Sequence, residues 1–131
     1  ALRPNTRVYT TDACVPISRL AECIKFTEEK IKEYGLQAPI VGHVGDGNFH
    51  CTVLYDPKKE GDLKTIREFS NQLINKTLEL DGTVTGEHGI GINKKEYLIK
   101  QHKDNIPLMQ IIKKNIDPKN IMNPGKVFDI N

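Results

Sequence analysis

The sequence lacks the usual marks of a disulfide-stabilised, membrane-spanning or strongly charged protein. Its three cysteines are an odd number without C-x-x-C spacing, so neither a disulfide framework nor a structural zinc cluster is indicated. No apolar run approaches the roughly 20 residues that a membrane-spanning helix needs, so no transmembrane segment is predicted. The formal net charge is only +2, from 19 basic and 17 acidic residues, which gives no reason to expect nucleic acid as a partner.

Several common catalytic motifs are also missing. No serine lies in a nucleophile-elbow pattern, so covalent catalysis has no evident candidate. The glycines of segment 86–91 do not form a G-x-G-x-x-G motif between a strand and a helix, and there is no P-loop, so nucleotide-binding fingerprints are not supported. The length of 131 residues predicts a single domain, 1–131. Because Ala1 is not an initiator methionine, we expect a fragment with its targeting information upstream.

Hydrophobic periodicity divides the chain into strands and helices. A period near 3.6 predicts helices at 18–34, 62–80, 94–101 and 107–116. Ser18 is the expected N-cap of the first helix and Gly35 the residue that ends it, and Pro107 lies near the first position of the last. Alternating and β-branched residues predict a strand at 10–15 and a hairpin across 38–55 that turns at 45–48. The order strand, helix, strand, strand, helix is a split β-α-β pattern of ferredoxin-like type, short of its last strand. We therefore expect an α+β fold, with a partial sheet, helices on one face and a C-terminal helical tail.

The hairpin is predicted to carry two histidines on one face. If Asp46 and Gly47 form a two-residue loop, His43 stands directly opposite His50. Directly opposed residues have Cβ atoms roughly 4.5–5.5 Å apart, close enough for two imidazoles to share one metal ion. The alternative is that two histidines near a turn are ordinary surface residues. A longer loop would break this pairing geometry.

A zinc, manganese or iron site needs at least one further ligand and an open position for substrate. Glu87 is the leading candidate, in a glycine-rich loop beside His88. Adjacent residues of an extended backbone point opposite ways, so one of this pair could bind metal while the other does acid–base work. Asp46 is the rival carboxylate, although its turn position already explains it. The loop could also be an ordinary polar connection.

Four segments in order resemble the C-terminal region of FAD-linked D-lactate dehydrogenases, which belong to the vanillyl-alcohol oxidase type of flavoproteins. The likeness spans nearly the whole chain. The segments are T-D-A-C-V-P-I-S-R-L at 11–20, G-H-V-G-D-G-N-F-H at 42–50, G-E-H-G-I-G at 86–91 and M-N-P-G-K at 122–126.

The resemblance implies the oxidation of a D-2-hydroxy acid to a 2-oxo acid, with hydride passing to FAD and electrons leaving to cytochrome c or a quinone. A divalent metal, Zn or Mn, would hold the substrate and lower the pKa of its hydroxyl group. By position, the family's metal ligands match His43, His50 and Glu87, and its general base matches His88. The positions beside the flavin match Glu87, His88, Gly89 and Asn123.

The same resemblance implies that the FAD-binding domain precedes this region and is absent from these residues. We therefore expect 1–131 to be the C-terminal fragment of a larger FAD-linked oxidase, inactive alone and bearing only the edge of a flavin site. Mitochondrial localisation follows from the family and not from any targeting segment in the chain.

The substrate can be narrowed by two positions. Relatives that act on D-2-hydroxyglutarate tend to carry lysine at the position of Thr10 and asparagine at that of Thr52, groups suited to a second carboxylate. D-lactate, oxidised to pyruvate, is therefore preferred, with D-2-hydroxyglutarate or glycolate as alternatives within the family. Two other hypotheses are a metal-dependent hydrolase, in which the same groups activate water, and a folding or interaction module with an empty site.

Overall fold

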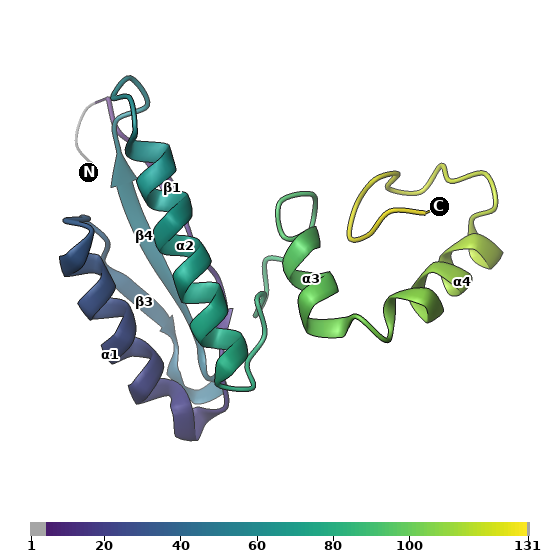
Figure 1. The fold of residues 1–131 in the computed structure, drawn as a ribbon, viewed down its shortest axis with the longest axis horizontal. Coiled ribbons are helices and arrows are strands. Elements are labelled where there is room, and N and C mark those ends of the chain that lie inside the picture. The colour runs from purple at the N-terminus through teal and green to yellow at the C-terminus, as the bar shows by residue number, and fades with distance from the viewer. Residues whose placement is uncertain (1–4, 131) are drawn as a thin grey trace. The chain divides into compact units, whose positions relative to one another are not determined.

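The structure, a computed structural model, describes residues 5–130. The chain divides into two compact units, Ala1–Glu87 and His88–Asn131 (Figure 1). The expectation of a single domain over 1–131 stays a prediction. Within the described residues, no helix has both the length and the apolar character needed to cross a lipid bilayer.

The sheet of the first unit is built around a central strand, β4. One edge of β4 pairs with β3, and the other edge pairs with β1 and β2, all antiparallel. Both long helices lie on the same face of this sheet (Figure 1), so the predicted α+β, ferredoxin-like arrangement is confirmed. In chain order the elements are β1 (Arg7–Thr10), β2 (Ala13–Cys14), α1 (Ile17–Glu33), β3 (Ile40–His43), β4 (Asn48–Tyr55) and α2 (Asp62–Glu79).

The first helix begins two residues earlier than the capping pattern predicted. Helix α1 starts at Ile17 with Pro16 as its N-cap and no side-chain capping bond, so the prediction that Ser18 caps it is wrong. The fixed backbone of a proline suits an entry from an extended segment without a polar cap. Gly35 follows the helix with φ 61°, a left-handed conformation that favours glycine and ends α1 as predicted.

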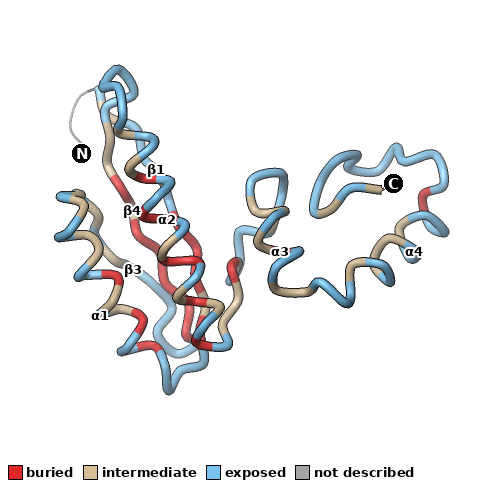
Figure 2. Tube along the Cα trace, viewed as in Figure 1, coloured by how far each residue is buried: buried red, intermediate tan, exposed pale blue. Residues whose placement is uncertain are grey.

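The core lies between the sheet and the two helices. Successive strand residues point to opposite faces, so Phe49, Cys51 and Val53 of β4 turn toward the helices and are at most 2% exposed. Phe69 and Leu73 of α2 pack into the same cluster. Figure 2 shows buried positions following β4 and the inner sides of the helices. Burial also raises the pKa of the Cys51 thiol to about 11, which keeps this group protonated.

The predicted two-residue hairpin loop is wrong. In the structure Val41 stands opposite His50 and His43 stands opposite Asn48, with a 3-10 turn, η1 (Val44–Asp46), and Gly47 between the strands. The turn is fixed by the packing of Gly47 against the segment before α1. The amide of Val15 donates to the carbonyl of Gly47 at 3.0 Å, and a Cβ on Gly47 would lie 2.0 Å from the Val15 carbonyl oxygen.

The first strand is interrupted, where a single strand at 10–15 was predicted. Thr11 and Asp12 separate β1 from β2, and both are buried polar residues. The hydroxyl oxygen of Thr11 accepts a hydrogen bond from the main-chain amide of Cys51 at 2.9 Å. A side chain thus replaces one of the main-chain hydrogen bonds between the strands. The break therefore places two buried polar side chains, those of Thr11 and Asp12, beside β4.

The missing last strand of the ferredoxin-like pattern is reduced to one bridge. After α2, Thr83 and Cys14 exchange two main-chain hydrogen bonds, of 2.7 and 3.2 Å. Cys14 uses both of its main-chain groups on this edge, so the bridge lies on the side of β2 away from β4. A last strand beside the first would occupy this position. The bridge ties the segment that leads to Glu87 against the sheet.

The second unit consists of two short helices and a tail. Helices α3 (Lys95–His102) and α4 (Ile106–Ile116) match the predicted segments within one residue, and Pro107 lies in the first turn of α4 as expected. No residue of α4 is buried within the described chain. Four of its large apolar side chains are 50–68% exposed, and they are Leu108, Ile111, Ile112 and Ile116.

The tail is organised by one carboxylate. Asp117 accepts hydrogen bonds from the amides of Ile121, at 3.0 Å, and Met122, at 2.8 Å, and pairs with Lys113. These contacts lower the pKa of Asp117 from 3.8 to about 2, and the hydrogen bond from Lys113 has the largest effect. The carboxylate therefore closes α4 and turns the chain back.

Because the folded pKa of Asp117 lies below its unfolded value, its stabilising contribution is present above about pH 4 and is lost as the pH falls toward 2. We expect the amides of Ile121 and Met122 to stay protected from hydrogen exchange near pH 4 and to lose protection toward pH 2. Asp117→Asn should lose this protection at neutral pH. The exposed Asp104→Asn control should keep it, and equal protection in both variants would contradict the assignment.

Candidate metal centre

The hairpin places His43 and His50 on the face of the sheet away from the helices. The observed register differs from the predicted one by two residues, an even number, so both side chains keep the same face. They are diagonal neighbours and not directly opposed, with ring centroids 6.3 Å apart and ring planes at 85°. The His50 side chain is 9% exposed, whereas that of His43 is 62% exposed.

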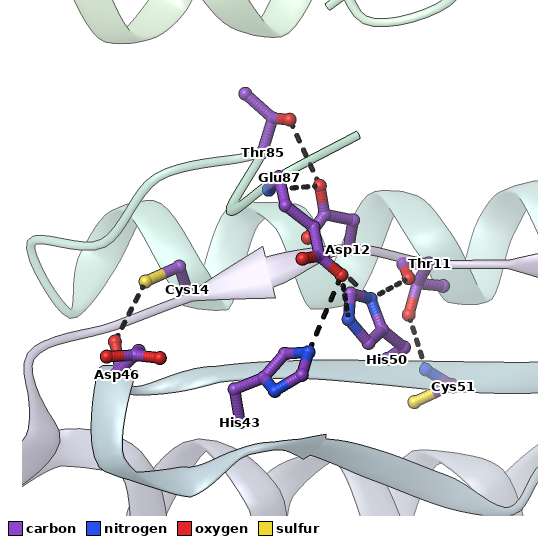
Figure 3. A network of polar contacts seen from close by, with 9 residues as sticks. All are labelled: Thr11, Asp12, Cys14, His43, Asp46, His50, Cys51, Thr85 and Glu87. Carbon is purple, nitrogen blue, oxygen red and sulfur yellow. Dashed lines mark hydrogen bonds and ion pairs between the residues drawn. The ribbon is translucent and has the colours of Figure 1, made fainter. Parts of the chain in front are cut away.

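Glu87 brings a carboxylate to the two imidazoles. Its Oε1 lies 3.0 Å from Nε2 of His50 and 3.8 Å from Nε2 of His43 (Figure 3). One ligand atom from each of the three residues lies within 4.8 Å of the others. Zinc binds histidine nitrogen and carboxylate oxygen at roughly 2.0–2.2 Å, so atoms at these separations can share one ion.

The orientation of His50 fits the binding of a cation. Its Nδ1 lies 3.1 Å from the carbonyl oxygen of Thr11. Because a carbonyl only accepts, Nδ1 must carry the hydrogen, which leaves the lone pair of a neutral ring on Nε2. That lone pair faces the Glu87 carboxylate, and two acceptors this close are stabilised by a proton or a metal ion between them. A main-chain carbonyl that fixes the tautomer is typical of metal-ligating histidines.

The loop that carries Glu87 approaches the sheet at a glycine. A Cβ on Gly86 would lie 2.5 Å from Cγ of Asn48, a buried residue at the start of β4. Only glycine permits this approach. The Thr83 bridge and Gly86 together deliver Glu87 to the hairpin.

The rival carboxylate does not join this cluster. Asp46, the rival carboxylate, lies in η1, where its main-chain carbonyl faces the Cys14 thiol at 3.4 Å (Figure 3). Among the described residues, the carboxylate beside both hairpin histidines is that of Glu87. The residues predicted to act as base and beside the flavin, His88, Gly89 and Asn123, belong to the second unit, and their roles stay predictions.

Sequence reasoning missed the polar residues that surround these ligands. The Asp12 carboxylate accepts the Thr85 hydroxyl at 3.0 Å and the Glu87 amide at 3.2 Å. The available signals were an acidic residue inside a predicted short strand and its place in the family-like segment 11–20, and neither of them indicated a contact with residues 85–87.

Comparison with known proteins defines the class of this chain. Residues 1–127 match the family described as FAD linked oxidases, C-terminal domain, and the chain belongs to this family. The structure is similar to that of 4-ethylphenol oxidase from Gulosibacter chungangensis, with a TM-score of 0.68 over 97% of this chain and 25% of that one. At 20% identity, this likeness concerns the fold alone.

Among curated proteins, the chain is 44% identical over 99% of its length to "Probable D-lactate dehydrogenase, mitochondrial" of Danio rerio, covering 26% of that protein. It is 40% identical over 97% of its length to "D-lactate dehydrogenase [cytochrome], mitochondrial" of Kluyveromyces lactis, covering 22%. It is 38% identical, again over 97%, to "Glycolate oxidase subunit GlcD" of Bacillus subtilis, covering 27%. The chain therefore spans about a quarter of these relatives.

A methyl group at Gly86 should disturb the approach of the loop. We expect Gly86→Ala to lower the free energy of unfolding by about 1–3 kcal/mol, because the buried Asn48 must move. Gly45→Ala is the matched control, since a Cβ there meets no atom within 4 Å. Urea denaturation of both variants measures the difference, and equal stabilities would contradict the close approach.

Proposed function

We propose that this chain is the C-terminal, metal-binding part of a flavin-dependent D-2-hydroxy acid dehydrogenase that oxidises D-lactate to pyruvate. The observation that carries the proposal is the convergence of His43, His50 and Glu87 in a member of the FAD-linked oxidase family. The FAD-binding part would lie in the three quarters of the relatives that this chain does not match. The exposed apolar side chains of α4 support a chain that packs against further protein.

The oxidation removes a hydride from C2 of the substrate and a proton from its 2-hydroxyl group. When bound, a divalent metal of the zinc or manganese type would polarise that hydroxyl, and FAD would accept the hydride. In this chain, His43, His50 and Glu87 would hold the metal, and His88 would take the hydroxyl proton as general base. Gly89 and Asn123 would lie beside the flavin.

The substrate preference is supported by a pair of threonines. Thr10 and Thr52 stand directly opposite each other across β1 and β4. Thr52 lies two residues beyond His50, so it shares the face of that histidine. Neutral hydroxyl groups offer no cation to a second carboxylate, which favours D-lactate over D-2-hydroxyglutarate. Glycolate remains an alternative, since one relative is named as a glycolate oxidase subunit.

Electron transfer and location are proposed from the relatives. The Kluyveromyces lactis relative is named "D-lactate dehydrogenase [cytochrome], mitochondrial" and the Saccharomyces cerevisiae relative "D-lactate dehydrogenase [cytochrome] 1, mitochondrial". We therefore favour cytochrome c as the electron acceptor, with a quinone as the alternative, and a mitochondrial location. A metal-dependent hydrolase would use the same three ligands, but it would leave the membership in a flavin-dependent family unexplained.

The ligand assignment predicts the metal content of the intact protein. His43→Ala and His50→Ala should each lower the metal affinity and the rate of D-lactate-dependent dye reduction by at least about 100-fold, since even outer-shell changes cost 10- to 100-fold. His102→Ala, a histidine of α3, is the control and should retain both. Metal analysis and dye reduction measure these effects. An unchanged metal content in both hairpin variants would exclude the ligand assignment. Full D-lactate-dependent activity in an intact protein without flavin absorbance would exclude the flavin-dependent dehydrogenase.

The base assignment predicts a different phenotype. In the intact protein, His88→Ala should retain FAD and metal but lose flavin reduction by D-lactate, because the hydroxyl proton has no acceptor. We expect a fall of about 100-fold or more in the single-turnover rate, the usual scale of general base catalysis. Stopped-flow absorbance of the flavin measures this rate. A normal rate would exclude His88 as the base.

A further inference from the structure

A buried carboxylate lies behind the candidate metal centre. The Asp12 side chain is 0% exposed, at the break between β1 and β2. Burial of an ionised carboxylate costs free energy unless hydrogen bonds compensate for the lost water. A carboxylate at this position is therefore expected to accept hydrogen bonds from the residues around it. Asp12 is not one of the three proposed metal ligands, so its burial needs a separate explanation.

The contacts of Asp12 are directed at the loop that carries Glu87. Its Oδ2 accepts two hydrogen bonds from that loop, one from the Thr85 hydroxyl at 3.0 Å and one from the Glu87 amide at 3.2 Å (Figure 3). Hydrogen bonds to a charged acceptor are about twice as strong as those between neutral groups. Asp12 therefore fixes the main chain of Glu87 and leaves the Glu87 carboxylate to face His50.

The same break in the strand orients His50. The carbonyl of Thr11 accepts Nδ1–H of His50 at 3.1 Å, and Oδ1 of Asp12 lies 3.7 Å from the same nitrogen. A carboxylate this close to a ligating imidazole increases the negative charge that the bound cation senses. Two consecutive residues thus act on two different ligands, Thr11 on His50 and Asp12 on Glu87.

We propose that Asp12 is the positioning residue of the metal centre, which holds Glu87 in place for coordination without binding the metal itself. This inference rests on the proposed ligands His43, His50 and Glu87. It differs from a purely structural role because the loop is held by an anionic acceptor at the back of the ligand set. Removal of that charge should therefore affect metal binding more than folding.

The test uses Zn²⁺ and Co²⁺ as probes in the intact protein. Asp12→Asn keeps the shape and one acceptor oxygen but removes the charge. We expect its Zn²⁺ affinity, from competition with a chromophoric chelator, to fall about 10- to 100-fold. The visible spectrum of the variant saturated with Co²⁺ should keep the wild-type bands, since the spectrum reports the ligand set and Asp12 is not part of it, and the circular dichroism of the metal-free variant should stay that of the wild type. A spectrum typical of a changed ligand set would make Asp12 a ligand and overturn the inference.

Asp46→Asn is the matched control, an isosteric change at an exposed acid in the hairpin turn, and it should leave affinity and spectrum unchanged. Thr85→Val is a second variant that removes one of the two loop bonds and should weaken Zn²⁺ binding about 3- to 10-fold. It decides the matter if Asp12→Asn does not fold. Combined with Asp12→Asn, its effect should be less than additive.

The outcomes separate this inference from the proposed function. If His43→Ala and His50→Ala lose Zn²⁺ while Asp12→Asn and Thr85→Val bind it as the wild type does, the positioning role is overturned and the metal centre stands. If none of the variants changes Zn²⁺ affinity, the proposed ligands fail first. An affinity loss in Asp46→Asn as large as in Asp12→Asn would show a general charge effect and would also overturn the inference.

Discussion

The first unit depends on the alternation of side chains along β4. Because successive residues of a strand point to opposite faces, packing Phe49, Cys51 and Val53 against the helices necessarily turns His50 and Thr52 to the other face. A slip of one residue would bury His50 in the core and expose the core residues. The apolar core and the candidate metal centre are therefore two consequences of one register.

This coupling explains why the face of the two histidines could be predicted although the loop could not. The sequence pattern around Asp46 and Gly47 favours a two-residue turn, but the packing of Gly47 on Val15 selects a longer one. The resulting register shift is even, so His43 keeps its face and becomes a diagonal neighbour of His50. Parity is set by the strand pattern, whereas turn length is set by tertiary contact.

Glu87 was singled out by its glycine-rich loop and by the family resemblance. The helices, the split β-α-β order and the shared face of the two hairpin histidines could be predicted because periodicity and hairpin spacing are local properties. The network behind the ligands could not. Asp12 contacts Thr85 and Glu87, which lie more than 70 positions later in the chain. The residues on either side of Asp12 favour one continuous strand, so the sequence gives no sign of the break at which it lies. The Thr83–Cys14 bridge was missed likewise, because a single pair has no periodicity.

The three ligands come from segments that the chain brings together only on folding. His43 and His50 are held by the hairpin ladder, but Glu87 is held by one bridge, the Gly86 contact and the hydrogen bonds to Asp12. A metal bound by all three residues would add a connection between the hairpin and the end of the first unit. Since such a site does not exist in the unfolded chain, the free energy of metal binding would stabilise the fold. Glu87 lies at the end of the first unit, so a metal bound there would also order the loop that carries it, and His88 directly follows it.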